Sequence, residues 1–198
     1  MADRLKDKVA IVTGAGSSGP GWGNGKAAAV LFAREGAKIF AIDINEDAAR
    51  ETQEIIRSEG GACAIRAVDV SDSEQVQAMV DECMSTYGQI DVLHNNVGIL
   101  KLGDVVELDE EDWDKVVAVN FRSMYLTCKY VIPHMLARSS GAIVNIASIA
   151  GARYMGVPYI AYSTTKGSIL PFTRDVALQY ADKGIRANTI LPGLMDTP

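Results

Sequence analysis

Apolar and polar positions follow two alternating patterns along the chain. Short runs that are apolar almost throughout and rich in β-branched residues are typical of strands buried on both faces of a sheet. Longer segments place apolar residues three or four positions apart, which is the spacing of one helix face. These patterns predict strands over Val9–Thr13, Lys38–Asp43, Ala62–Val68, Asp91–Asn95, Ala142–Ala147 and Ile185–Leu191, and helices over Lys26–Glu35, Glu46–Glu59, Ser73–Tyr87, Glu110–Arg138 and Tyr159–Asp182.

The order of these elements predicts the fold class. Strands and helices alternate, and strands that are apolar throughout imply a parallel sheet covered by helices on both faces. We therefore expect an α/β protein with a doubly wound, Rossmann-type sheet. No repeat, low-complexity tract or linker interrupts residues 1–198, which indicates a single domain. Asp72 and Asp109 precede two predicted helices and are expected to be their N-caps.

Composition narrows the class of protein. Apolar residues make up 48% of the chain, and the net charge of -6 argues against nucleic acid as the main partner. The N-terminal sequence MADRLKDK lacks the apolar core of a signal peptide, and no apolar run is long enough to cross a membrane. Three scattered cysteines, Cys63, Cys83 and Cys128, indicate reduced, mostly buried thiols in a cytoplasmic protein. We expect no metal site.

A glycine-rich stretch, TGAGSSGPGWGNGKA, joins the first predicted strand to the first predicted helix. Glycines between a strand and a helix let bare backbone approach a phosphate group. A helix that began earlier would contain unfavourable glycines, so Gly25 is expected to open the helix and Gly14 to end the strand. Asp43 follows 18 residues after Gly25, where an acid binds an adenosine ribose and repels a 2′-phosphate. This pattern favours NAD over NADP, whereas an ordinary turn with an exposed aspartate is the alternative.

Several other polar or glycine residues follow predicted strands, and the carboxyl ends of parallel strands share one edge of the sheet. In their order and type they resemble the short-chain dehydrogenase/reductase family over almost the whole chain. The matching motifs are Thr13-Gly14 with Gly23-Asn24-Gly25, Asn95-Asn96-Val97-Gly98, Asn120, Ser148, Tyr162 with Lys166, and Pro192-Gly193. The resemblance implies a single dinucleotide-binding and catalytic domain.

The glycine loop departs from the family pattern. The family allows three residues between its first two glycines, but eight separate Gly14 from Gly23. Removing Ser18-Gly19-Pro20-Gly21-Trp22 restores the spacing, so these five residues are interpreted as an insert. An alternative register through Gly19 and Gly21 misses the family spacing by one residue. Trp22 is expected either to pack on its own helix or to cover the cofactor or the substrate entrance.

Tyr162 and Lys166 lie four positions apart on a predicted helix and therefore share a face. A lysine ammonium favours the phenolate of a nearby tyrosine, which suits a proton acceptor or donor. Tyr162 is expected to exchange a proton with an alcohol or carbonyl oxygen as hydride moves to or from NAD. Ser148, just after the fifth predicted strand, is expected to bond the same oxygen.

The family resemblance implies further roles. Asn120 would hold a water that relays the proton, and Lys166 would also bind the nicotinamide ribose. The resemblance also implies a homotetramer or homodimer, a small alcohol or ketone substrate, and a chain that lacks the family's last strand and its substrate lid. The cofactor contacts that it implies are Gly14, Gly23, Asn24 and Gly25 at the phosphates, Asp43 at the adenosine ribose, Asp69 and Val70 at the adenine, Asn96 and Gly98 with Tyr162 and Lys166 near the nicotinamide ribose, and Pro192, Gly193 and Thr197 along the nicotinamide and pyrophosphate.

Two alternatives to an alcohol dehydrogenase stay open. Enoyl-thioester reductases, a divergent branch of the family, have a longer glycine loop with an aromatic-glycine pair such as Trp22-Gly23. Their tyrosine lies at the spacing of Tyr159 from Lys166, although Ser148 and Asn120 suit carbonyl chemistry better. A dinucleotide-binding sensor or scaffold without turnover is the second alternative.

Overall fold

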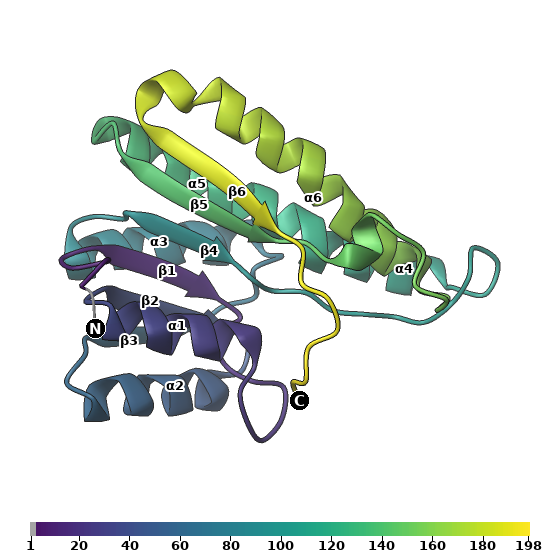
Figure 1. Ribbon diagram of the computed structural model, residues 1–198, viewed down its shortest axis with the longest axis horizontal. Coiled ribbons are helices and arrows are strands. Elements are labelled where there is room, and N and C mark those ends of the chain that lie inside the picture. The colour runs from purple at the N-terminus through teal and green to yellow at the C-terminus, as the bar shows by residue number, and fades with distance from the viewer. Residues whose placement is uncertain (1–2) are drawn as a thin grey trace.

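Six parallel strands form one sheet in the computed structural model, which describes residues 3–198 (Figure 1). The strand order across the sheet is β3-β2-β1-β4-β5-β6. The chain thus runs outward from the centre to one edge, returns to the centre, and runs to the other edge. The strands are β1 Val9–Thr13, β2 Lys38–Asp43, β3 Cys63–Ala67, β4 Val92–Asn95, β5 Gly141–Ile146 and β6 Ile185–Ile190. This is the predicted Rossmann-type topology, and its switch point lies between β1 and β4.

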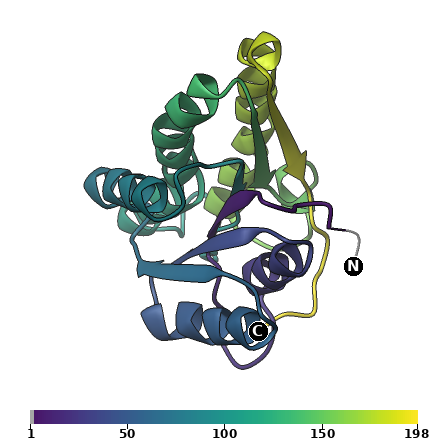
Figure 2. The same cartoon turned by 90° about the vertical axis from the view of Figure 1, so that its left-hand side faces the viewer.

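Helices cover both faces of the sheet (Figure 2). On one face, α1 (Asn24–Arg34) and α2 (Glu46–Ser58) pack on Ala10 and Val12 of β1. On the other face, α3 (Ser73–Tyr87), α5 (Ser123–Ala137) and α6 (Ile160–Gln179) pack on Val9 and Ile11. Side chains alternate between the two faces of a strand, so β1, buried at every position, contributes to both cores.

The predicted boundaries need three corrections. The segment expected as one helix over Glu110–Arg138 is α4 (Glu110–Val117), a π-helical turn (Ala118–Arg122) and α5. Helix α1 begins at Asn24, one residue before the predicted opening at Gly25, because Gly23 takes the extended N-cap conformation. Helix α6 ends at Gln179 rather than Asp182, and a short 3₁₀ turn over Ala181–Lys183 leads to the left-handed Gly184.

The expected N-caps differ in their contacts. The side chain of Asp72 accepts hydrogen bonds from the backbone N–H groups of Glu74 and Gln75, as predicted. Asp109 occupies the N-cap position of α4, but its side chain makes no capping hydrogen bond within residues 3–198.

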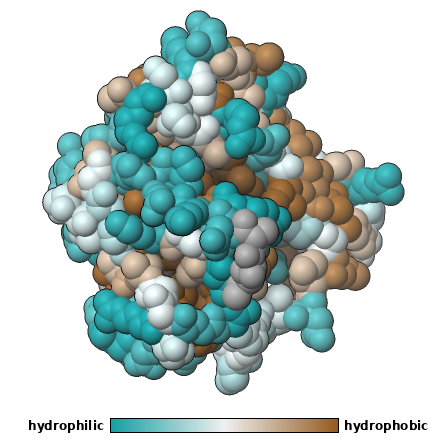
Figure 3. Space-filling view, turned by 60° about the vertical axis from the view of Figure 1, so that its left-hand side comes forward, coloured by the Kyte–Doolittle hydropathy of each residue, from teal (hydrophilic) through white to brown (hydrophobic). Residues whose placement is uncertain are grey.

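On the face shown in Figure 3, hydrophilic regions adjoin a concentrated hydrophobic area. Exposed large apolar side chains include Ile190 at the end of β6 and Leu194 and Met195 just beyond it. Within residues 3–198, no helix has the length and apolar character that crossing a bilayer requires. Cys63, Cys83 and Cys128 are free and buried, as expected, and burial raises the pKa of each thiol to about 12.

His94 on β4 makes the stability of the fold depend on acid pH. The imidazole is buried against the ring of Phe32, and its Nδ1 has no hydrogen-bond partner within residues 3–198. Burial disfavours the charged ring and lowers the pKa of His94 to about 4. Between pH 6.5 and 4 the unfolded chain therefore binds a proton at this position that the folded protein does not bind.

We predict that this one group lowers the free energy of unfolding by about 3 kcal/mol as the pH falls from 6.5 to 4. Urea titrations of the wild type and of His94→Leu at several pH values measure the difference in slope. His134→Gln, which removes the other histidine, should keep the wild-type slope. Equal pH dependence in the wild type and His94→Leu would show that His94 protonates freely in the folded protein.

Candidate active site

The glycine loop is held close to the start of α1 by contacts that exclude side chains. Gly14 has a left-handed backbone, with φ 63°. A Cβ atom on Gly25 would collide with the carbonyl oxygen of Gly14 and lie 2.6 Å from Nδ2 of Asn96. The Asn96 amide in turn donates to the Gly14 carbonyl at 3.1 Å. Gly14 is thus required by its left-handed backbone, and Gly25 by close approach.

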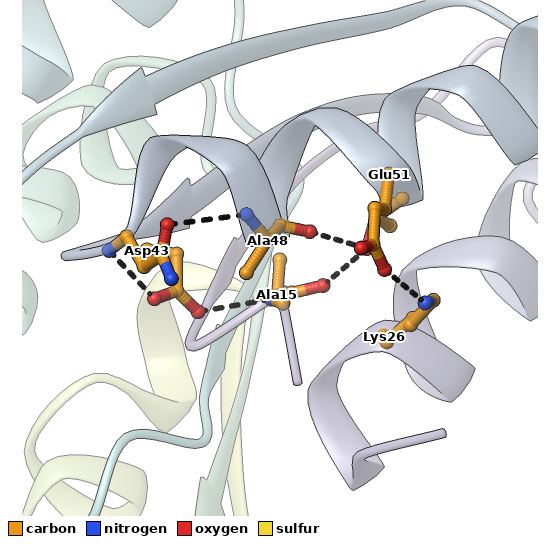
Figure 4. Close-up of polar contacts among 8 residues, drawn as sticks. Ala15, Lys26, Asp43, Ala48 and Glu51 are labelled. Atoms are coloured by element: carbon orange, nitrogen blue, oxygen red, sulfur yellow. Dashed lines mark hydrogen bonds and ion pairs between the residues drawn. The ribbon is translucent and has the colours of Figure 1, made fainter. Parts of the chain in front are cut away.

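Asp43 fastens this loop to the end of β2 (Figure 4). Its Oδ2 accepts the backbone N–H of Gly16 at 2.9 Å, and its Oδ1 accepts that of Asn45 at 3.0 Å. Thr52 of α2 donates its hydroxyl to the Ala15 carbonyl at 2.7 Å from the other side. The first turn of the loop therefore has a fixed position relative to the Asp43 carboxylate.

The insert contacts the helix that follows it. The indole of Trp22 lies over Lys26 of its own helix, with 5.7 Å between Nζ and the ring centroid. Lys26 also pairs with Glu51 of α2 at 3.1 Å. Of the two expectations for Trp22, packing on its own helix is the one observed. Of the loop glycines, Gly14, Gly16, Gly23 and Gly25 line the adjoining cleft, and Ser18 is the residue of the insert that does so.

A cleft of about 720 Å³ runs along the carboxyl edge of the sheet from the glycine loop to the loops after β2, β3 and β4. We call it the cofactor cleft. Asp43, Asp69 and Val70 lie along its far part, and the buried Oγ of Ser17 in its wall has no hydrogen-bond partner within residues 3–198. The predicted cofactor contacts that line it are Gly14, Gly23, Asn24, Gly25, Asp43, Asp69, Val70, Asn96, Gly98 and Thr197.

The cofactor cleft continues into a second cavity of about 330 Å³, which we call the catalytic cavity. Asn24, Asn96, Gly98 and Thr197 line both spaces. Ser148, Tyr162, Lys166, Pro192 and Gly193 line the catalytic cavity. A ligand with two connected parts, one at the glycine loop and one at the tyrosine, can occupy both.

Lys166 is buried beneath the tyrosine ring. Its Nζ donates a hydrogen bond to the Ile146 carbonyl at 2.8 Å and lies 5.9 Å from the centroid of Tyr162. Burial lowers the pKa of Lys166 to about 8. A Cβ on Gly98 would lie 2.9 Å from this Nζ, so a side chain there would displace the end of the lysine.

Ser148 is oriented by its own backbone. Its Oγ accepts the N–H of Ala150 at 3.1 Å, where β5 passes into the 3₁₀ turn Ile149–Gly151. Because this bond uses an oxygen lone pair, the hydroxyl hydrogen is free to donate into the cavity.

Asn120 lies in the π-helical turn and is fully buried behind the cavity wall. Its Oδ1 accepts the N–H of Ile99 at 2.7 Å, and its Nδ2 donates to the Ile99 carbonyl at 2.9 Å and to Thr165 Oγ1 at 3.2 Å. Asn120 thus joins the loop after β4 to α6, one residue before Lys166. The water relay that the resemblance implies for it stays a prediction.

The sequence analysis did not identify several residues that line the cofactor cleft. Gly16 and Ser17 lie in the loop, while Lys115 and Val119 come from the helical region before Asn120. Gly16 belongs to the glycine-rich stretch, and that composition is the signal that could have identified it. Lys115 and Val119 give no local signal, because only the tertiary fold brings their helix over the cleft.

Gly25→Ala is expected to weaken NADH binding by at least about tenfold, because the new methyl group would displace the Gly14 carbonyl or the Asn96 amide. Quenching of tryptophan fluorescence by NADH measures the affinity. Gly19→Ala is the matched control, since its Cβ would meet only the ring of Pro198 at 3.2 Å. Unchanged affinity in Gly25→Ala would contradict the role of this close approach.

The chain is similar in sequence and fold to proteins of a known family. Residues 8–198 match the family model described as short chain dehydrogenase. A cyclohexanol dehydrogenase from Acinetobacter sp. (strain SE19) is 38% identical over 200 residues, which cover 100% of this chain and 77% of the relative.

Solved structures show the same likeness. A crystal structure assigned to a short-chain dehydrogenase/reductase from Burkholderia xenovorans superposes with a TM-score of 0.96 at 44% identity, covering 98% of this chain and 77% of the other. The structure of an NAD⁺-bound xylitol dehydrogenase superposes with a TM-score of 0.92 at 34% identity, covering 98% of this chain and 73% of the other.

Proposed function

Because the chain belongs to the short-chain dehydrogenase family of oxidoreductases, we propose that it transfers a hydride between NAD(H) and a secondary alcohol or ketone. The observation that carries this proposal is the continuity of the cofactor cleft with a cavity lined by Ser148, Tyr162 and Lys166. The names of the similar proteins, a cyclohexanol dehydrogenase and an NAD⁺-bound xylitol dehydrogenase, support the same type of reaction.

The residues of the cofactor cleft fit a nicotinamide dinucleotide. The start of α1 and the glycine turn suit a pyrophosphate, and the Asp43 carboxylate suits the hydroxyls of an adenosine ribose. Such a cofactor, when bound, supplies or accepts the hydride. A 2′-phosphate would face the same carboxylate, so we propose NAD(H) rather than NADP(H).

Tyr162 is proposed to exchange the proton. Lys166 keeps a positive ammonium near the ring when protonated, which favours the phenolate, so Tyr162 can accept a proton from an alcohol and return it to a carbonyl oxygen. Ser148 donates its free hydroxyl hydrogen to the same substrate oxygen and orients it. Asn120 positions the Gly98–Ile99 backbone and the Thr165 turn around Lys166, and we retain the proposal that it also holds a relay water.

We further propose that the protein assembles into a homo-oligomer. Tyr125 on α5 and Leu178 on α6 expose large apolar side chains that a second copy would cover. Light scattering coupled to gel filtration measures the state, and a monomer at micromolar concentration would contradict it.

The reaction is tested with linear and cyclic secondary alcohols and NAD⁺, followed by the absorbance of the reduced nicotinamide. Oxidation of at least one alcohol, with the reverse reaction on its ketone, is expected. The same assay with 2-enoyl thioesters and NADH tests the alternative through Tyr159, whose ring lies edge-on to Tyr162 with centroids 5.5 Å apart. Turnover of enoyl thioesters alone, lost in Tyr159→Phe, would replace the proposal with that alternative.

A further inference from the structure

A third space, which we call the side cavity, opens beside the catalytic cavity. It has a volume of about 590 Å³ and lies between the loop after β4 and the segment that joins β5 to α6. Ala150, Met155 and Tyr159 line both cavities, so the two spaces share a wall. The side cavity is within the size range of small-molecule sites. A molecule that reacts beside Tyr162 can therefore extend into it.

Backbone contacts hold the two walls of the side cavity together. The Gly103 N–H donates to the Pro158 carbonyl at 2.7 Å, and Gly103 forms an isolated parallel bridge with Tyr159. Gly103 has a φ of 147°, and a Cβ there would lie 3.1 Å from the Cβ of Leu108. The loop after β4 is thereby fixed against the start of α6, and the cavity belongs to the fold.

The lining of the side cavity is mainly apolar. Val105, Val157, Pro158 and Ile160 contribute aliphatic surface, and Met155 adds a flexible thioether. Hydroxyl groups come from Ser163 and Thr164 and from the phenols of Tyr154 and Tyr159. Burial of a hydrocarbon chain or ring against such a lining is favourable. A sugar with a hydroxyl on every carbon would find few hydrogen-bond partners there.

Arg153 is the positively charged residue that lines the side cavity. It makes no side-chain hydrogen bond or ion pair within residues 3–198, although it lines the cavity. The other charged residue there, Asp104, already accepts the N–H groups of Val106 and Glu107 at 2.8 and 3.0 Å. Arg153 is exposed, so its guanidinium is free to donate to a ligand at the edge of the apolar cavity, which suits a carboxylate or another oxyanion.

We propose that the side cavity binds the part of the substrate remote from the reacting carbon, and that this part is an apolar body ending in an anionic group held by Arg153. This inference rests on the proposed alcohol or ketone reaction in the catalytic cavity. It assigns the substrate class as a secondary hydroxy acid or keto acid whose anionic group is separated from the reacting carbon by a hydrocarbon ring or chain.

Two matched alcohols test this assignment. trans-4-Hydroxycyclohexanecarboxylate and trans-4-methylcyclohexanol share a ring and a secondary alcohol, and they differ in the charge of the substituent. We expect the wild type to favour the carboxylate by about tenfold in kcat/KM, with a preference that falls as salt is added. Arg153→Gln should abolish the preference, and Arg153→Lys should keep part of it. Arg174→Gln, which removes an exposed arginine paired with its neighbour Asp175, should keep the wild-type ratio.

An equal ratio in the wild type and Arg153→Gln would overturn the inference. If neither alcohol is oxidised, calorimetric titration of the NADH-saturated protein with cyclohexanecarboxylate decides the matter without turnover. Binding that weakens at least about fivefold in Arg153→Gln but not in Arg174→Gln would support the anion site. The proposed reaction, and not the anion site, would then be wrong. Binding that does not depend on Arg153 would overturn the anion site.

Discussion

Tyr162→Phe is expected to lower kcat for alcohol oxidation by about 1,000-fold, the middle of the range for loss of a general acid or base. The substitution removes one hydroxyl from the catalytic cavity and keeps the ring beside Lys166. Without this hydroxyl, the proposed proton acceptor is missing as the carbonyl forms. Affinity for NADH should stay within about threefold of the wild type, because the glycine loop and Asp43 are untouched.

Tyr159→Phe is the matched control for this prediction. Tyr159 lines the same cavity and contacts Tyr162 edge-on, so the control removes a second hydroxyl from the same place. We expect it to change kcat by less than about tenfold. Comparable losses of kcat in the two variants would show that Tyr162 has no specific role in proton exchange.

Asp43→Asn should remove much of the preference between cofactors. With the carboxylate present we expect NADH to bind about 100-fold more tightly than NADPH, because a 2′-phosphate would approach a negative charge. The amide removes that charge at nearly constant size. The preference should fall to about tenfold or less, through tighter NADPH binding and weaker NADH binding.

Asp43 also holds Gly16, so the effect of charge must be separated from the effect of a loosened loop. Thr52→Val provides this control, because it removes the hydrogen bond to the Ala15 carbonyl without changing charge. It should weaken NADH and NADPH to a similar extent. A shift in preference with Thr52→Val as large as that with Asp43→Asn would assign the selectivity to loop position.

Patterns of apolar residues carried most of the information about the fold. Each strand ends within one residue of its predicted boundaries, because a run such as Val9–Thr13 is apolar on both sides and a flanking glycine or aspartate limits it. The π-helical turn at Ala118–Arg122 was not predictable in this way. One extra residue in a turn leaves the apolar spacing of α4 and α5 almost unchanged, yet it directs Asn120 toward Ile99 and Thr165.

The candidate site, too, could be predicted from the sequence only in part. Ser148, Tyr162 and Lys166 could be brought together from sequence, because strand ends share one edge and positions four apart share a helix face. The side cavity could not be predicted from the sequence, because it depends on a bridge between Gly103 and Tyr159, which lie far apart in the chain. The position of Trp22 over Lys26 likewise depends on how the insert folds.

Hydride transfer is tested most directly by isotope tracing. The protein is incubated with NAD⁺ and secondary alcohols deuterated at the carbinol carbon, including linear, cyclic and carboxylate-bearing members, and the nicotinamide is analysed by mass spectrometry and NMR. We predict that deuterium from at least one alcohol appears on the nicotinamide ring of the reduced cofactor, and that Tyr162→Phe suppresses the transfer. Tight binding of NADH with no transfer from any of the alcohols would contradict the proposed reaction and indicate a dinucleotide-binding protein without turnover.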